Sequence, residues 1–322
     1  MRFVRIFKKN DDLVILVSAL ILLLIAYSQP SVQIMRQQKN YMFVIDVTQS
    51  MNVQDMPFKE KPISRLAYTK QLLKQTIENL PCNTKVGLSV FFRGSVALLY
   101  TPIEACSNYH ALLDTIDHLE WRMASHGSSN IRLGLQSISS LITTSNVSAS
   151  VVFFTDGEEA PPLNVFSKTD LSGWQGGRDW LLVGIGENKP TPIPKLNANN
   201  EVIGYWSTYS IKIEPATQVN EGANNQRDES IATAPYEYYL SKLDEPYMKE
   251  LASEIGARYI KASNAEHLII AMDNLPSNTY EQTKLELNWI SALFALLTML
   301  SSYIPDIIHK ISIRKKAGSN PF

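Results

Sequence analysis

The sequence predicts an α/β fold, namely a doubly wound domain with a mostly parallel central sheet and one antiparallel edge strand, flanked by two transmembrane helices. Two observations lead to this prediction. From residue 41 onward, short runs of β-branched and aromatic residues alternate with longer stretches of helical periodicity, which is typical of βαβ units in a sheet covered on both faces. In addition, an uncharged apolar run lies near each end of the chain, and such runs are typical of membrane helices.

Length and composition limit the classes of function. The chain has 322 residues, of which 45% are hydrophobic and 19% charged, so it can form one large or two small domains with a buried core. Thirty basic and 31 acidic residues leave no positive excess for a phosphate backbone, which speaks against a nucleic-acid partner. Two cysteines and five histidines show no spacing that would suit zinc, so we expect no zinc site.

The first apolar run predicts a transmembrane helix or signal anchor over residues 13–28. Four basic residues precede it, which predicts that residues 1–12 form a cytoplasmic N-terminus. A cleaved secretory signal peptide is the alternative, because Ala26 and Ser28 would suit a signal peptidase. Pro30, just beyond them, disfavours cleavage.

The second apolar run predicts a transmembrane helix over residues 287–304, and residues 305–322 form a basic tail that indicates the cytoplasmic side. The alternative is a buried helix of a globular core, since such helices also reach about this length. Because both basic flanks lie at the outer ends of the chain, we expect residues 30–285 to lie across the membrane from the cytoplasm. In a bacterium this places the central domain in the periplasm, anchored to the inner membrane.

The central domain is expected over residues 40–275. Its strand-like runs are short and apolar: 41–46, 86–92, 95–101, 150–156, 179–187 and 258–260. Its helical runs lie between and after them: 64–80, 109–119, 130–142, 246–255 and 265–272. A turn at Arg93-Gly94 joins two strands into a hairpin, so one edge strand should be antiparallel. Residues 189–234 are rich in Asn, Pro, Thr and Gly and are interpreted as an insertion, either a recognition element or a tolerated surface loop.

The two cysteines flank the predicted hairpin. If its centre lies at Gly94, Cys82 and Cys106 face each other across the strand pair. In an oxidising compartment this pair could form a disulfide that closes a loop of about 25 residues and contributes about 3 kcal/mol. The alternative is two buried free thiols, because cysteine is among the most buried residue types.

Oxygen-bearing side chains cluster at predicted strand ends and helix starts. The first strand ends in Asp46, Thr48 and Ser50; Ser129 precedes a helix; and Asp156 ends a later strand. Ligands of such sheets bind at the carboxyl ends of the strands. Oxygen-only coordination suits a hard cation, with Mg²⁺ expected and Mn²⁺ or Ca²⁺ as alternatives. Each motif alone also fits an ordinary helix cap or turn, so the prediction depends on their combination.

This ordered set of five residues resembles the metal-ion-dependent adhesion site (MIDAS) of the von Willebrand factor A (vWA) domain, a Rossmann-like fold, and the resemblance covers about residues 40–275. Thr48 and Ser129 depart from the usual Ser and Thr, but both keep the hydroxyl group. The resemblance implies that Thr48, Ser50 and Ser129 coordinate the ion directly or through water, and that Asp46 and Asp156 bind it largely through water. One coordination position is then left for an acidic residue of a partner protein.

Longer segments resemble narrower groups. The segment DVTQSMNVQDMP, followed by SRLAYTK, is similar to membrane-anchored, Bat-like bacterial A-domain proteins encoded beside MoxR-type AAA+ ATPases, in which an Asp like Asp55 and an Arg-Leu like Arg65-Leu66 recur. The segments KVGLSVFF, FTDGEEAPP and LLVGIGENKPTPIPK are similar to accessory proteins of methanol-oxidation operons, of the MxaC and MxaL type. The resemblance implies an assembly factor for a periplasmic metalloenzyme.

Three acidic residues near these motifs are assigned simpler roles. Asp55 is expected to cap or turn the loop that follows it. Glu158 and Glu159 could tune the metal site or be solvated, and their place in a polar loop favours solvation.

We expect a binding module and not an enzyme. A strand ending in FVIDVT also resembles the start of a haloacid-dehalogenase-type phosphatase, but Thr48 stands where such an enzyme needs a second carboxylate. No phosphate-binding loop of the Gly-x-x-x-x-Gly-Lys-Ser/Thr type occurs. A membrane scaffold without metal dependence is the remaining alternative.

Overall fold

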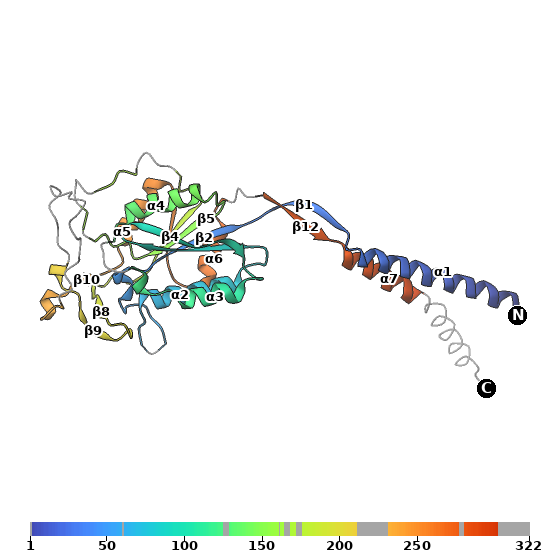
Figure 1. Cartoon of the computed structure of the whole chain (residues 1–322), viewed down its shortest axis with the longest axis horizontal. Coiled ribbons are helices and arrows are strands. Elements are labelled where there is room, and N and C mark those ends of the chain that lie inside the picture. The colour runs from blue at the N-terminus through green and yellow to red at the C-terminus, as the bar shows by residue number, and fades with distance from the viewer. Residues whose placement is uncertain are drawn as a thin grey trace, which may run out of the picture. The chain divides into compact units, whose positions relative to one another are not determined.

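The computed structural model describes residues 2–59, 61–124, 129–160, 162–163, 168–171, 176–210, 231–276 and 280–301. The chain divides into two compact units (Figure 1). One unit combines Met1–Arg36 with Tyr280–Phe322, and the other is Gln37–Thr279.

The second unit contains a six-stranded sheet in the order β11-β6-β5-β2-β3-β4. The strands are β2 (Asn40–Asp46), β3 (Lys85–Phe92), β4 (Ser95–Glu104), β5 (Ser150–Thr155), β6 (Trp180–Gly184) and β11 (Arg258–Lys261). All neighbouring pairs are parallel except β3 and β4. The predicted mostly parallel sheet with one antiparallel edge strand is therefore confirmed.

Helices cover both faces of this sheet, as Figure 1 shows for α4 and α2. Along β2, Phe43 and Ile45 face a core formed with α2 (Arg65–Asn79), α3 (Tyr109–Asp117) and α6 (Ala265–Asp273). Met42 and Val44 face the opposite core, formed with α4 (Ile131–Thr144) and α5 (Glu245–Ile255). Successive side chains of a strand point to opposite faces, so a strand buried on both sides is mainly apolar, as residues 41–45 of β2 show.

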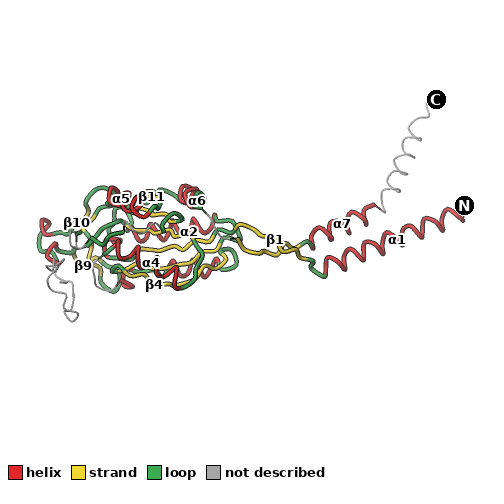
Figure 2. Tube along the Cα trace, turned by 90° about the horizontal axis from the view of Figure 1, so that it is seen from above, coloured by secondary structure: helices red, strands yellow, loops and turns green. Residues whose placement is uncertain are grey.

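The first unit contains α1 (Arg2–Tyr27), β1 (Ser31–Gln37), β12 (Tyr280–Glu286) and α7 (Asn288–Ser301). Strand β1 pairs with β12, and Figure 2 shows α7 running beside α1. No helix in the described part of the chain is both long and apolar enough to cross a membrane, so the spans predicted at 13–28 and 287–304 are not confirmed. The basic tail lies outside the described residues.

The predicted insertion contains more regular structure than its composition indicates. Its described parts form β7 (Thr191–Pro192), β8 (Pro194–Leu196) and β9 (Val202–Tyr205), in which β8 pairs with β9. Strand β7 pairs with β10 (Leu240–Ser241), which lies after the insertion. Residues 211–230 lie outside the described residues. Ile193 and Trp206 of this segment pack against Val53 in a small buried cluster. The insertion therefore contacts the loop that follows β2.

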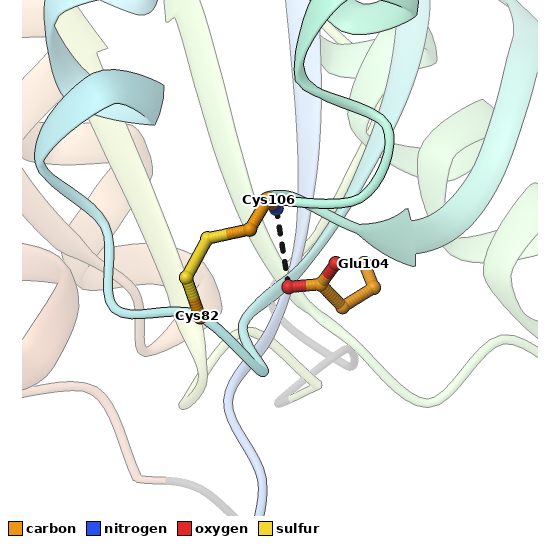
Figure 3. Close-up of side chains that lie close together, drawn as sticks. All are labelled: Cys82, Glu104 and Cys106. Carbon is orange, nitrogen blue, oxygen red and sulfur yellow. Dashed lines mark hydrogen bonds between the residues drawn. A yellow bond between two sulfur atoms is a disulfide. The ribbon is translucent and has the colours of Figure 1, made fainter.

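Cys82 and Cys106 form a disulfide with 5.4 Å between their Cα atoms, which confirms the predicted pairing. The register is different from the one assumed, because Phe92 pairs with Ser95 and the hairpin centre lies between Arg93 and Gly94. Two register shifts between Val86 and Ser89 change the alignment farther along the strands. Figure 3 shows Glu104 beside the disulfide. The sulfur atoms are bonded to each other, so these three residues form a structural cluster and not a metal site.

Replacing both cysteines by serine should lower the free energy of unfolding by about 3 kcal/mol, because the bond links residues 24 positions apart and restricts the unfolded chain. Urea denaturation of the Cys82→Ser/Cys106→Ser variant measures this loss. Wild-type protein under reducing conditions is the control and should match the variant. An unchanged denaturation midpoint would show that the disulfide contributes nothing to stability.

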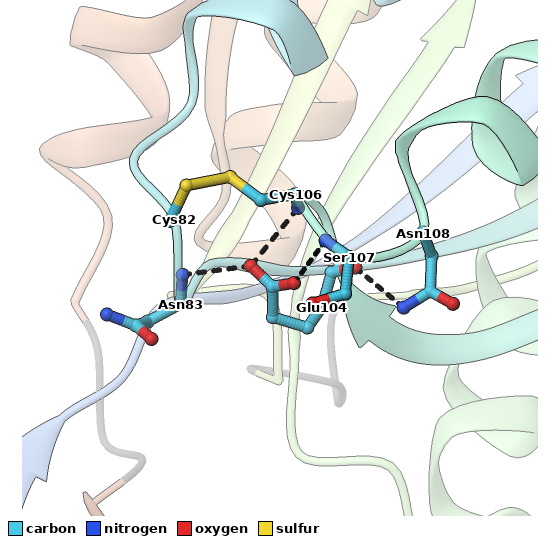
Figure 4. The surroundings of a disulfide bond; sticks show 6 residues. All are labelled: Cys82, Asn83, Glu104, Cys106, Ser107 and Asn108. Atoms are coloured by element: carbon cyan, nitrogen blue, oxygen red, sulfur yellow. Dashed lines mark hydrogen bonds between the residues drawn. A yellow bond between two sulfur atoms is a disulfide. The ribbon is translucent and has the colours of Figure 1, made fainter. Parts of the chain in front are cut away.

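The carboxylate of Glu104 holds the chain on both sides of this disulfide (Figure 4). Its Oε1 accepts hydrogen bonds from the backbone N–H groups of Asn83 and Cys106, each at 3.1 Å, and its Oε2 accepts one from Ser107 at 2.5 Å. Burial opposes ionisation, but these hydrogen bonds together outweigh it and lower the pKa of Glu104 to about 2. The charged form is therefore the one that stabilises the fold.

The Glu104→Gln variant should lose about 1 kcal/mol of stability at neutral pH, because the side chain is partly exposed and its bonds are screened. Because the pKa of Glu104 is lower in the folded than in the unfolded protein, its carboxylate stabilises the fold fully at pH values above the unfolded pKa of 4.5. This stabilisation is lost as the pH falls through about 2. Urea denaturation of both proteins from pH 7 to pH 2 tests this, and the difference between them should disappear at the acid end. A difference that does not change with pH would contradict the assigned hydrogen bonds.

Candidate metal centre

The centre is built where β2 and β5 end next to each other. Asp46 is the last residue of β2, and Asp156 directly follows β5. The two strands are paired in parallel, with Ile45 opposite Phe154, so both carboxylates lie at the same edge of the sheet. Both side chains are completely buried.

Asp46 shapes the loop that follows it. Its Oδ1 accepts hydrogen bonds from the backbone N–H of Thr48 at 2.9 Å and from the Thr48 hydroxyl at 2.6 Å. Its Oδ2 accepts one from the hydroxyl of Thr155 at 2.7 Å. The hydroxyl oxygens of Thr48 and Ser50 lie 3.2 Å apart. Asp46 therefore brings the two hydroxyl groups of its loop together.

Asp156 is held from two sides. Its Oδ1 accepts a hydrogen bond from the backbone N–H of Glu158 at 3.0 Å, which closes the turn after β5. Its Oδ2 pairs with Nη1 of Arg65 at 2.7 Å. Both oxygens of this carboxylate thus have partners within the protein.

Ser129 reaches the same place from the start of α4. Its carbonyl accepts a hydrogen bond from the N–H of Ala160 at 2.8 Å, which links its loop to the chain after β5. One small pocket is lined by residues from all three predicted loops, from the insertion and from the segment that follows the insertion: Thr48, Gln49, Ser50, Ser129, Glu158, Ala160, Ile193 and Tyr239. The structure therefore brings Thr48, Ser50 and Ser129, the three predicted hydroxyl ligands, to one pocket. Asp46 does not line this pocket but is bonded to Thr48. His126 and its neighbours at 125–128 lie outside the described residues.

Two oxygen atoms of this pocket are buried without a hydrogen-bond partner among the described residues. They are Oγ of Ser129, a residue only 5% exposed, and Oε2 of Glu158. A buried polar atom without a partner is costly, so in native proteins it generally marks a position where water, an ion or a ligand binds. Hydroxyl and carboxylate oxygens are the ligands that Mg²⁺ and similar hard cations prefer. The residues present therefore fit a divalent cation.

The electrostatics of the pocket also favour a cation. Burial, followed by the negative charge of Asp156, raises the pKa of Asp46 to about 7, although hydrogen bonds from Thr48 and Thr155 partly offset this. The same two causes raise the pKa of Glu158 to about 7, partly offset by Ser241, Tyr239 and Arg65. Three carboxyl groups thus share one buried region, and a positive ion would stabilise their charged forms.

Arg65 belongs to the site, although the sequence analysis assigned it no role there. Its Nη2 pairs with Asp55 at 2.7 Å, while its Nη1 contacts Asp156 and the hydroxyl of Ser241, each at 2.7 Å. Its side chain is completely buried. At Gly186, whose φ is +127°, an added Cβ would lie 2.8 Å from Nε of Arg65, so only glycine leaves room for the guanidinium.

Asp55 does not cap or turn its loop as predicted. It forms a buried ion pair with Arg65, and its Oδ2 also accepts a hydrogen bond from the N–H of Glu187 at 3.1 Å. A charged guanidinium competes better for a buried carboxylate than a neutral backbone group of the same loop does. One feature of the sequence could have indicated this pairing: an Asp like Asp55 and an Arg-Leu like Arg65-Leu66 recur together in the Bat-like proteins that the segment resembles.

The expectation that Glu158 and Glu159 are solvated is wrong for both. Glu158 lines the pocket. Glu159 accepts hydrogen bonds from the N–H groups of Ile131 at 3.1 Å and Arg132 at 3.3 Å, and from the hydroxyl of Tyr247 at 2.7 Å. Free N–H groups at a helix N-terminus attract a carboxylate, and this draws Glu159 out of solvent.

Comparison with known proteins agrees with this fold. Residues 41–159 match the model of the family described as von Willebrand factor type A domain. A UPF0353 protein of Mycobacterium sp. (strain KMS) is 30% identical over 158 residues, which are 47% of this chain and 44% of the relative. A UPF0353 protein of Mycobacterium avium is 29% identical over 160 residues, 47% of this chain and 45% of the relative. The chain thus spans less than half the length of these curated relatives.

Two solved structures share the architecture at low sequence identity. The conserved hypothetical protein BatB from Bacteroides thetaiotaomicron has a TM-score of 0.51 and 18% identity, covering 74% of this chain and 98% of its own. An aerotolerance-related membrane protein from Bacteroides fragilis has a TM-score of 0.47 and 19% identity, with the same coverage. The family match and the likeness to BatB support a vWA-type α/β fold for the unit Gln37–Thr279.

Proposed function

We propose that this domain binds one divalent cation through Asp46, Thr48, Ser50, Ser129 and Asp156, and uses it to dock an acidic residue of a partner protein. The observation that carries the proposal is the buried hydroxyl of Ser129, which has no hydrogen-bond partner among the described residues, in the pocket that Thr48 and Ser50 also line. Mg²⁺ is the expected ion, and Mn²⁺ or Ca²⁺ would suit the same oxygen donors.

The proposed ligands are of two kinds, neutral hydroxyl groups and charged carboxylates. Thr48, Ser50 and Ser129 offer neutral hydroxyls to the pocket. Asp46 and Asp156 use their oxygens in hydrogen bonds and an ion pair within the protein, which suits binding through water. A bound cation would supply a positive charge that these ligands neutralise only in part, and this charge favours an outside carboxylate.

We infer a binding module and not an enzyme. A phosphatase of the haloacid-dehalogenase type would need Asp46 as a free nucleophile and an acid at the position of Thr48. Here Thr48 donates a hydrogen bond to Oδ1 of Asp46, and Thr155 donates one to Oδ2. Both oxygens are therefore occupied, and no group at position 48 can transfer a proton as a carboxylic acid would.

The cellular setting is the second part of the proposal. We propose a membrane-anchored accessory factor, with its vWA-type domain on the periplasmic side, that assists assembly of a metalloenzyme of the methanol-oxidation type together with a MoxR-type ATPase system. Apolar side chains exposed along α1 and α7, among them Leu13 and Trp289, suit a lipid environment. The disulfide suits an oxidising compartment. A scaffold without metal dependence is the alternative.

Photo-crosslinking in membranes tests the docking role. A photoreactive residue replaces Gln49, which lines the pocket, in the full-length chain. A partner should be captured with Mg²⁺ and lost with chelator or with Ser129→Ala. The same residue at Glu201, in the β8–β9 turn, is the control for non-specific capture. Capture from position 49 that is the same with and without chelator would contradict metal-dependent docking and favour the scaffold.

A further inference from the structure

Glu158 lines the pocket, although no motif assigned it there. Its Oε2 is buried and has no hydrogen-bond partner in the part of the chain that the structure describes. Thr48, Ser50 and Ser129 line the same pocket. One residue with a carboxylate and three residues with hydroxyl groups thus border the same small space.

Several contacts fix the position of this carboxylate. The backbone N–H of Glu158 is bonded to Asp156, which anchors the residue to the end of β5. The hydroxyls of Ser241 and Tyr239 interact with its side chain, and Ser241 is in turn bonded to Arg65. These neighbours come from the turn after β5 and from residues 239–241, and Arg65 connects them to Asp55 in the loop after β2.

The buried guanidinium next to the site does not pair with Oε2 of Glu158, which has no hydrogen-bond partner in the described ranges of the chain. Arg65 directs Nε and Nη2 to Asp55, and it directs Nη1 to Asp156 and Ser241. Among the described residues, the other buried arginine, Arg132, pairs with Glu254. A negative oxygen in such a position is stable only if a cation or a donor binds it.

We propose that Glu158 is an internal ligand of the bound cation and occupies the coordination position that a partner's acidic residue would take. This inference depends on the proposed function, and it adds regulation to it. In the resting protein the chain's own carboxylate closes the site, which strengthens metal binding in the absence of a partner. Docking then requires the partner's carboxylate to displace Glu158.

Luminescence of Eu³⁺ bound to the full-length protein tests the ligation directly, because decay rates in H₂O and D₂O give the number of coordinated waters. The Glu158→Gln variant should gain about one coordinated water, and its affinity for Mn²⁺, measured by electron paramagnetic resonance, should fall at least about tenfold. Glu187→Gln is the matched control, since Glu187 pairs with Lys261 and does not line the pocket. It should leave both quantities unchanged.

A second variant separates ligation from a distant charge effect. Glu158→Asp keeps the charge but withdraws the carboxylate by one methylene, so it should also gain water and lose affinity for Mn²⁺. If Glu158→Asp behaves as the wild type does, or if Glu158→Gln binds Eu³⁺ with unchanged hydration, the inference is overturned and the proposed function stands. If the wild type binds neither Eu³⁺ nor Mn²⁺, the proposed function itself fails.

Discussion

Replacing Arg65 by methionine should lower the free energy of unfolding by roughly 3–5 kcal/mol, because it leaves buried carboxylates without their positive partner. Arg65 is completely buried and pairs with both Asp55 and Asp156. Urea denaturation followed by tryptophan fluorescence, at pH 8 with chelator present, measures the change. The result links the fold to the site, since the same guanidinium holds α2 against the turn that carries Asp156.

Arg65→Lys is the control for this experiment. Lysine keeps the positive charge but lacks the planar fork that contacts two carboxylates at once, so its loss of stability should be smaller than that of Arg65→Met. A denaturation midpoint for Arg65→Met equal to that of the wild type would show that the ion pairs do not stabilise the fold.

Replacing Asp46 by asparagine should have opposite effects on stability and on metal binding. The Asp46→Asn variant without metal should be more stable than the wild type at pH 8 by roughly 2–4 kcal/mol, because it removes a charge that is unfavourable in the fold. Its affinity for Mn²⁺ should be lost, since the carboxylate that positions the Thr48 hydroxyl is gone.

The sign of the pH dependence follows from the raised pKa. Asp46 titrates near 3.8 when unfolded and near 7 in the folded protein, so its ionisation destabilises the fold increasingly between these values and by a constant amount above them. The stability difference between Asp46→Asn and the wild type should therefore grow from pH 4 to pH 7 and then level off. Urea denaturation with chelator tests this, and a variant less stable than the wild type at pH 8 would contradict the account.

The sequence predicted those elements whose physical cause is local. The strand predicted from the apolar run of β2 and the helix predicted from the spacing of α2 are both confirmed. A strand buried on two faces and a helix buried on one face each leave a clear hydrophobic pattern in the sequence. The pair β1 and β12 was missed because SVQIMRQ and YEQTKLE are largely polar and pair with each other outside the main sheet. Contacts between distant residues leave no such pattern in a single sequence.

The difference between local patterns and contacts of distant residues also explains which site residues could be predicted from the sequence and which could not. Asp46, Thr48 and Ser50 share one turn, so their convergence could be predicted from spacing. Arg65 lies 91 positions from Asp156, and an arginine at the start of a helix usually indicates an exposed position. The place of Glu158 depends on the segment that follows the insertion, because Tyr239 and Ser241 interact with it, and no local pattern predicts that contact.

Calorimetric titration of Mg²⁺ and of Mn²⁺ into the full-length chain tests the central claim most directly, which is that oxygen atoms from three separate loops share one cation. The account predicts binding of one ion per chain, weakened at least about tenfold by Ser129→Ala. The absence of binding at millimolar concentrations of either ion, or equal binding to the wild type and to Ser129→Ala, would contradict it.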